Sequence, residues 1–129
     1  MISITTKSPY AVRALVELYR HGEGPVPIAE LARRGEIPSQ FLEQLFATLR
    51  RAGVLRSQRG VKGGYSFDRP PAEVTVLEIV ELLDGPLGAG ATGVFADAAR
   101  AARAVLAEST VAEVAEAEIR AAGAPMYHI

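Results

Sequence analysis

The chain has 129 residues, 49% of them hydrophobic and 22% charged, and it contains no cysteine. It is long enough to bury roughly two thirds of its unfolded surface in one domain, and the lack of thiols excludes disulfides, thiol catalysis and cysteine-ligated zinc or iron–sulfur sites. The net charge of −1 hides two unlike halves, because residues 1–69 carry 11 Lys/Arg and 6 Asp/Glu, whereas residues 70–129 carry 3 Arg and 9 Asp/Glu.

These totals also constrain location and partners. No apolar run approaches the roughly 18 residues of a membrane span, and residues 1–10 lack the basic and apolar regions of a secretion signal. We therefore expect a cytoplasmic protein without membrane contact. The basic first half indicates an anionic partner for that half, of which nucleic acid is the most common. A chance distribution of solvated charges is the alternative.

Three helices with short connections are predicted in the first half. Ser8 and Pro9 indicate the start of the first helix, because serine caps helices and proline favours the first helical position. A second helix is predicted over residues 28–34, ended by Gly35, and a third over residues 40–52. Two short helices joined by a tight, glycine-containing connection are typical of a helix-turn-helix.

The third helix has two unlike faces. At about 100° per residue, one side is apolar and the opposite side polar. The apolar side consists of Leu42, Leu45, Phe46, Leu49 and Ala52. The polar side consists of Gln40, Glu43, Gln44, Ala47 and Arg51. Amides, a carboxylate and a guanidinium can read base edges in a major groove, although an ordinary solvated helix face has the same composition.

A β-hairpin is predicted directly after this helix. Strands over residues 55–58 and 65–68 flank a loop with three glycines, which supply the positive φ angles of a tight loop. Arg59 and Lys62 place positive charge at its tip. A helix-turn-helix followed by a basic hairpin is the winged-helix arrangement. A phosphate-binding loop is excluded, because the Walker spacing is absent and no helix begins after Gly64.

The second half is predicted to be helical around one glycine-rich loop. Capping boxes begin at Thr75 and Thr110, each with a glutamate three residues later. The loop between the helices contains four glycines and one proline. The predicted elements are a helix over residues 76–83, a loop over 85–93, a long helix over 94–108 and a last helix over 110–122.

The long helix carries a narrow apolar seam whose members repeat at spacings of three and four. The seam consists of Phe95, Ala98, Ala102, Val105 and Leu106. Because its small side chains let two helices approach closely, we expect a homodimer interface here, with folding back onto the same domain as the alternative. The chain then divides into a winged helix-turn-helix over residues 1–85 and, over residues 86–129, a hinge loop, a dimerisation helix and a C-terminal helix.

Motifs in the same order characterise a known family. They are Thr5-Thr6-Lys7, Tyr10-Ala-Val-Arg-Ala-Leu, Ile28-Ala-Glu-Leu-Ala, Phe41-Leu-Glu-Gln-Leu-Phe, Leu49-Arg-Arg-Ala-Gly-Val-Leu and Arg59-Gly-Val-Lys-Gly-Gly-Tyr. Over residues 1–85 the chain resembles the Rrf2 family of winged-helix transcriptional regulators. The start of its last helix, Thr110-Val-Ala-Glu-Val, is also similar to a late helix of that family.

The resemblance implies a mainly α protein with a small β-hairpin wing that binds DNA as a homodimer, as a repressor on a dyad-symmetric operator. The third helix would enter the major groove, and the arginine of the wing would enter the minor groove. We therefore expect DNA contacts from Thr6, Lys7, Ser39, Gln40, Glu43, Gln44, Arg51, Arg59, Lys62, Gly63 and Gly64.

The chain departs from the family in its sensor. Many members hold an iron–sulfur cluster on three cysteines in the loop before the long helix, but residues 85–93 contain none. Pro9 occupies the place of the family's non-cysteine ligand. No cofactor is expected, so the protein would be constitutive or would respond to a small molecule or a partner enzyme. A ligand cleft is expected at residues 87–93, where glycines allow two arrangements of the long helix.

Other functions have weaker support. The two histidines, His21 and His128, have no neighbouring ligands that would complete a metal site, and no G-x-S-x-G motif is present. Glu113, Glu116 and Glu118 are explained by a solvated helix face. We expect neither an enzyme nor a metal site. A winged-helix module that binds only protein partners, regulated by a partner enzyme or a small molecule, is the alternative to a DNA-binding regulator.

Overall fold

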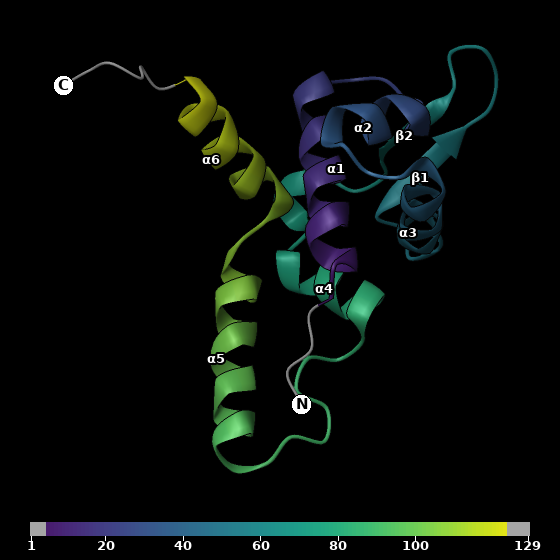
Figure 1. The fold of residues 1–129 in the computed structure, drawn as a ribbon. Helices are drawn as coiled ribbons and strands as arrows, with labels where there is room; N and C mark the ends of the chain where they lie inside the picture. Colours follow the sequence, from purple (N-terminus) through teal and green to yellow (C-terminus); the bar gives the residue numbers. More distant parts are fainter. Residues whose placement is uncertain (1–4, 124–129) are drawn as a thin grey trace.

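The computed structural model describes residues 5–123, so His128 and the C-terminal tail lie outside the described residues. Figure 1 shows a helical body with a two-stranded hairpin on one side and two helices, α5 and α6, on the other. This confirms the predicted mainly α fold with a small β wing. The elements are α1 (Lys7–His21), α2 (Ile28–Gly35), α3 (Ser39–Arg51), β1 (Leu55–Gln58), β2 (Gly64–Phe67), the 3₁₀ helix η1 (Pro71–Glu73), α4 (Val76–Asp84), α5 (Gly93–Glu108) and α6 (Val111–Gly123).

The body is built on one apolar core shared by α1, α2, α3 and β1. Leu15 of α1, Leu31 of α2, and Phe46 and Leu49 of α3 are fully buried in it. The guanidinium of Arg13 also joins α1 to α2 by donating to the carbonyl of Gly35 at 2.9 Å. Burying such side chains contributes roughly 1.5–3 kcal/mol each, which fixes the angle between the two helices of the helix-turn-helix.

The turn after α2 differs from the sequence prediction. Gly35 does not stop the helix in a left-handed conformation; it is the last residue of α2, and Glu36 adopts the left-handed conformation at φ 55°. Gly35 is closely packed instead, since a Cβ there would lie 2.9 Å from Cδ1 of Ile37 and would displace the end of that side chain. The backbone N–H of Ile37 then donates to the carbonyl of Ala32 at 2.9 Å, which closes the turn.

The hairpin is anchored to the body by its second strand. β1 and β2 pair antiparallel with Leu55 opposite Phe67. Tyr65 exchanges two backbone hydrogen bonds with Val26, at 2.9 and 2.8 Å, so the segment before α2 adds a third, one-residue strand. The Tyr65 ring also meets Phe46 of α3 edge-on, with ring centroids 5.2 Å apart. These contacts hold the wing at a fixed position beside α3.

The start of α1 differs from the prediction that Ser8 caps the helix. The N-cap is Thr6, and Ser8 lies in the first turn with only 2% of its surface exposed. Its hydroxyl donates to Oδ2 of Asp84 at 2.5 Å, and the hydroxyl of Thr5 donates to Oδ1 of the same carboxylate at 2.5 Å. Ser8 therefore joins α1 to the end of α4, a partner that lies far away in the sequence.

The C-terminal helices begin as predicted at their capping residues. The hydroxyl of Thr75 accepts from the backbone N–H of Glu78, and that of Thr110 accepts from Glu113, both at 3.1 Å. At Thr110 the box is reciprocal, because the Glu113 carboxylate accepts from the backbone N–H of Thr110 at 3.0 Å. Thr75 and Thr110 also form an isolated antiparallel bridge, which ties the start of α6 to the start of α4.

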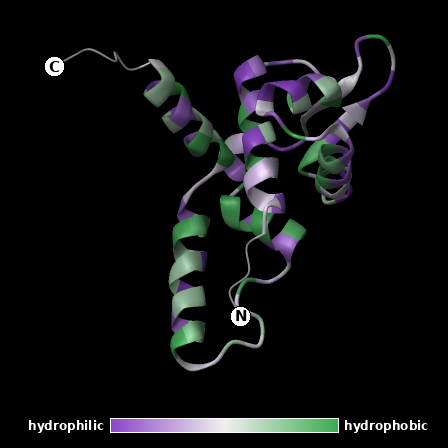
Figure 2. Cartoon of the chain, in the orientation of Figure 1, coloured by the Kyte–Doolittle hydropathy of each residue, from purple (hydrophilic) through white to green (hydrophobic). Residues whose placement is uncertain are grey.

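Helix α5 projects away from the body (Figure 1) and keeps apolar residues along its length (Figure 2). Its predicted seam covers two sides of the helix. Phe95, Ala98 and Val105 are exposed, whereas Ala102 and Leu106 are half-buried. The exposed side is centred on Val94, Ala98 and Val105 and lies about 120° around the helix from Ala99 and Leu106, which face the body.

Candidate nucleic-acid interface

Helix α3 presents a polar face to solvent. Its apolar side is buried as predicted at Leu42, Leu45, Phe46 and Leu49. Ala52, predicted on the same side, is exposed, because α3 ends at Arg51 and Ala52 is its C-cap. Ser39, Gln40, Glu43 and Gln44 are all exposed and are named here the recognition face. The burial of the opposite side holds these four side chains outward on a rigid helix. Such a helix fits the major groove of B-DNA, where amides and carboxylates can pair with base edges.

Arg51 lies at the far end of α3 and is held by its own helix. Its Nη2 donates to the Thr48 hydroxyl at 3.2 Å, and that hydroxyl donates to the carbonyl of Gln44 at 3.3 Å. Arg50 beside it is also exposed. Two guanidinium groups at the end of a recognition helix suit phosphate contacts, which position a protein on DNA without reading its sequence.

The first turn of α1 lies beside the first turn of α3. The rings of Tyr10 and Phe41 meet edge-on with centroids 5.6 Å apart, which brings the two helix starts together. Thr6 and Lys7, one turn before Tyr10, are exposed. The sequence prediction that both residues contact DNA is thus compatible with their position beside the recognition face.

The wing places two cations at its tip. Arg59 and Lys62 are exposed, and Figure 1 shows the loop between β1 and β2 protruding on the side opposite to α5 and α6. Gly63 and Gly64 lie at the base of this loop. A Cβ on Gly63 would lie 2.2 Å from the carbonyl oxygen of Gln58, so the tight base admits no side chain. The tip is polar apart from Val61, which is fully exposed.

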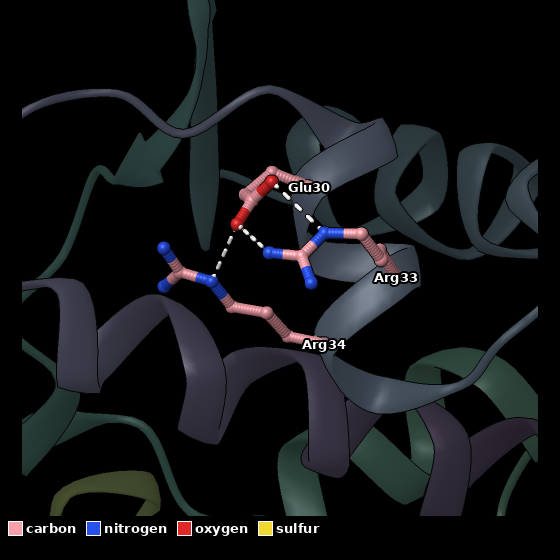
Figure 3. Close-up of polar contacts among 3 residues, drawn as sticks. All are labelled: Glu30, Arg33 and Arg34. Atoms are coloured by element: carbon pink, nitrogen blue, oxygen red, sulfur yellow. Dashed lines mark hydrogen bonds and ion pairs between the residues drawn. The ribbon is translucent and has the colours of Figure 1, made fainter.

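A basic cluster on α2 was missed from the sequence. Figure 3 shows Glu30 between Arg33 and Arg34, with carboxylate–guanidinium distances of 2.5 and 2.7 Å respectively. Hydrogen bonds from Arg33 and then Arg34 lower the pKa of Glu30, and the same carboxylate raises the pKa of Arg33. The spacing of three and four residues from Glu30 was the available signal. One carboxylate pairs with two arginines here, so the cluster carries one net positive charge.

Arg56 was also missed. It is exposed on β1, and its Nε donates to the Ser66 hydroxyl across the hairpin at 3.3 Å. An exposed position on a strand next to a basic loop was the signal for it. With Arg56 the basic surface continues from the wing tip down the first strand.

The described residues, 5–123, contain no group of three or more histidine, aspartate or glutamate side chains placed to hold a metal ion. Within the same span, no helix is long and apolar enough to cross a membrane. His21 is exposed at the end of α1.

Two cavities border the C-terminal helices. The loop in which a ligand cleft was expected borders a small one of about 270 Å³, lined by Gly90, Thr92 and Phe95 among others. A larger cleft of about 450 Å³ lies between α1, α4 and the last two helices, with Val12, Val80 and Leu106 in its walls. The larger cleft therefore lies away from the predicted loop.

Comparison with known proteins decides the class to which this arrangement belongs. Residues 4–92 match the Rrf2 family, described as an iron-dependent transcriptional regulator. The chain belongs to the Rrf2 family. A putative HTH-type transcriptional regulator of Synechocystis is 39% identical over 87 residues, and CymR of Bacillus subtilis is 37% identical over 87 residues. Each alignment covers 67% of this chain, but the chain spans only 59% and 63% of those two relatives.

Other Rrf2 members match over more of the chain. A putative HTH-type regulator of Mycobacterium tuberculosis is 36% identical, covering 87% of this chain and 80% of the relative. The structure of T. potens IscR matches with a TM-score of 0.83 and 34% identity, over 98% of this chain and 95% of that one. CymR, the global cysteine regulator of B. subtilis, matches with a TM-score of 0.81 and 29% identity, over 90% of this chain and 98% of that one. These relatives are transcriptional regulators rather than enzymes.

Proposed function

We propose that this Rrf2-family chain is a sequence-specific DNA-binding regulator of transcription. The observation that carries the proposal is the position of the recognition face between two exposed basic elements. The wing with Arg59 and Lys62 lies on one side of it, and the first turn of α1 with Lys7 lies beside its start. The Tyr65–Phe46 ring contact fixes the wing relative to α3, so the protein can meet two grooves as one rigid body.

The chemistry of each element suits a different groove. Gln40 and Gln44 carry amides that can pair with adenine in the major groove, and Glu43 can accept from the amino group of cytosine. Arg59 at the wing tip suits a narrow, A·T-rich minor groove, whose concentrated negative potential attracts a guanidinium. Lys62 suits a phosphate. On this basis, sequence specificity comes both from the base edges that α3 contacts and from the groove shape that the wing contacts.

The proposed regulator acts as a homodimeric repressor in the cytoplasm, with α5 as its interface. Val94 and Val105 keep 71% and 64% of their surfaces exposed on one side of that helix, and Phe95, about 90° around it, keeps 65%. An apolar stripe of this kind on a projecting helix supports pairing with a second copy. A two-fold dimer would place two recognition faces roughly 34 Å apart on one side of a dyad-symmetric operator, where a bound repressor blocks access to the DNA.

Two matched lysine substitutions test the proposed interface. Ala98 lies on the exposed apolar side of α5, and Ala107 lies about 180° around the helix and is also exposed. Ala98→Lys should shift the protein to monomer in sedimentation velocity, and Ala107→Lys should leave the dimer intact. A dimer that survives Ala98→Lys would place the interface on another surface.

The proposed regulator works without an iron–sulfur cluster, unlike many members of the family. Iron–sulfur clusters are held by cysteine thiolates, and the chain has none. The residues therefore do not fit that group. Protein purified without oxygen should contain no stoichiometric iron or sulfide and should bind its selected DNA without reconstitution. Stoichiometric iron with sulfide would refute this part of the proposal.

Selection from a random duplex library followed by fluorescence anisotropy tests the DNA-binding function. The wild type should enrich a dyad-symmetric sequence, and Gln44→Ala should lose roughly 1–3 kcal/mol of discrimination at one base pair of each half-site. Arg100→Gln is the control, because Arg100 is exposed on α5, on the side opposite to the wing. Failure to enrich any sequence, with only salt-sensitive binding to all DNA, would instead favour a winged-helix module for protein partners.

A further inference from the structure

The connection between α4 and α5 does not by itself fix the direction of α5. Gly85, Gly88, Gly90 and Gly93 all have positive φ values, between 60° and 85°, in the segment that joins the two helices. Glycine reaches such conformations at little cost but also leaves them easily. The angle between α5 and the body must therefore be set by side-chain contacts among α5, the loop and the body.

Glu81 is the side chain that makes this bridge. Its Oε2 accepts from the backbone N–H of Leu87 in the loop at 3.4 Å and from Nη1 of Arg103 in α5. One carboxylate oxygen on α4 thus holds both the start of the loop and the second half of α5. Glu81 and Arg103 expose 29% and 43% of their side chains, so the pair is half shielded from solvent.

Helix α4 gives Glu81 a fixed base. Ile79 and Val80, the two residues directly before Glu81, are buried in the body. Asp84, at the end of α4, is hydrogen-bonded to Ser8 of α1 at 2.5 Å. The position of the Glu81 carboxylate is therefore set by the DNA-binding body, whereas its partner Arg103 belongs to α5.

Two further contacts hold α5 on either side of the one that Glu81 makes with it. The end of α5 is anchored at the Thr75–Thr110 bridge, which acts as a pivot. Gly88 lies against Ala99: a Cβ on Gly88 would lie only 2.3 Å from the Ala99 Cβ, so the loop packs directly on α5. Between pivot and loop, the Arg103–Glu81 ion pair joins α5 to α4. The other ion pair of α5, Arg100 with Asp97, lies within the helix and reaches no other element.

We propose that Glu81 is a positioning residue that sets the angle between the DNA-binding body and α5, and thereby the half-site spacing that the dimer accepts. This inference rests on the proposed dimeric DNA-binding function. Two bodies joined through α5 present their recognition faces at a separation fixed by that angle in both protomers. Without the Glu81 contacts, the glycine segment lets each body turn about the pivot, and the dimer tolerates operators of different spacing.

A distance measurement between the two wings tests the mechanical part. The chain has no cysteine, so Ser57→Cys on exposed β1 gives one spin label per protomer. Pulsed dipolar spectroscopy on the labelled protein without further substitutions should give a narrow distribution of wing-to-wing distances. Glu81→Gln and Arg103→Gln should each broaden it, whereas Asp97→Asn, which breaks the pair inside α5, should not.

Binding to operators of altered spacing tests the functional part. Duplexes carry the selected operator with one or two base pairs added or removed at the dyad. The ratio of affinities for native and altered spacing should fall about fivefold in Glu81→Gln and Arg103→Gln, and should stay unchanged in Asp97→Asn. A dimer with equally narrow distances and equal spacing ratios in all variants would overturn the inference alone. A monomeric wild type would overturn the proposed dimer and the inference with it.

Discussion

Replacing Gly64 with alanine should strongly destabilise the wing. Gly64 has φ 144°, a conformation that L residues rarely adopt. A Cβ there would lie 2.3 Å from the carbonyl carbon and oxygen of Val26 and 2.6 Å from the nitrogen of Pro27. All three are backbone atoms and cannot rotate away, so β2 must separate from Val26 and lose the two hydrogen bonds of Tyr65.

The size of the effect follows from three contributions. Backbone strain at such a position costs about 1–3 kcal/mol, and two lost hydrogen bonds cost about 0.5–1.5 kcal/mol each. The lower entropy of the unfolded alanine chain returns about 0.4–1 kcal/mol. The free energy of unfolding should therefore fall by roughly 1–6 kcal/mol for Gly64→Ala.

Gly60→Ala is the matched control in urea denaturation. Gly60 also has a positive φ, 109°, but its Cβ would meet nothing within 4 Å. It should show only the strain contribution, about 1–3 kcal/mol less the unfolded-state gain. Equal destabilisation by the two substitutions would show that contact with Val26 does not hold the wing in place.

Three further predictions concern DNA affinity, pH and the α2 cluster. In fluorescence anisotropy, Arg59→Ala should weaken DNA binding by roughly 1–3 kcal/mol and relax the sequence preference at minor-groove positions, whereas Lys62→Ala should weaken binding to all duplexes alike. Unchanged affinity in both variants would refute the wing assignment. Burial raises the pKa of Asp84, but hydrogen bonds from Ser8 and Thr5 outweigh it and leave that pKa below its usual value. The difference in free energy of unfolding between the wild type and Asp84→Asn should thus be constant above about pH 5 and decline below about pH 4. Urea denaturation at a series of pH values measures this difference, and a difference that does not shrink in acid would refute the prediction. Glu30→Gln should steepen the salt dependence of DNA binding if Arg33 and Arg34 face phosphates, and an unchanged slope would place them away from DNA.

Local signals predicted most of the elements because each element is determined by neighbouring residues. The third helix has its predicted buried face and the hairpin strands lie within one residue of their predicted bounds, since periodic burial and a glycine loop need no distant partner. The capping box at Thr110 forms as expected, because both of its residues lie within one helical turn. The recognition face could be predicted for the same reason: it is the side of α3 opposite to the buried leucines.

Contacts between distant segments could not be predicted. Ser8 had the chemistry of a cap, but its partner Asp84 comes from another helix, and only the fold brings the two together. The seam on α5 was assigned as one stripe, whereas the body covers the side with Ala99 and leaves the side with Val105 exposed. Helical periodicity gives the width of an apolar stripe but not which part faces the chain's own domain.

The bridge between Thr75 and Thr110 has a consequence for how the fold tolerates change. The backbone N–H of Val76 donates to Ser109, and that of Val111 donates to Val74, both at 2.8 Å, so the chain leaves and re-enters the body at one place. Between these anchors α4 packs in the core through Ile79, whereas the loop over residues 85–92 and α5 form a closed excursion outside that core. Each doubling of such a loop costs only about 0.6 kcal/mol in closure entropy. The length of α5 can therefore change by whole helical turns while α6 keeps its contacts with α1.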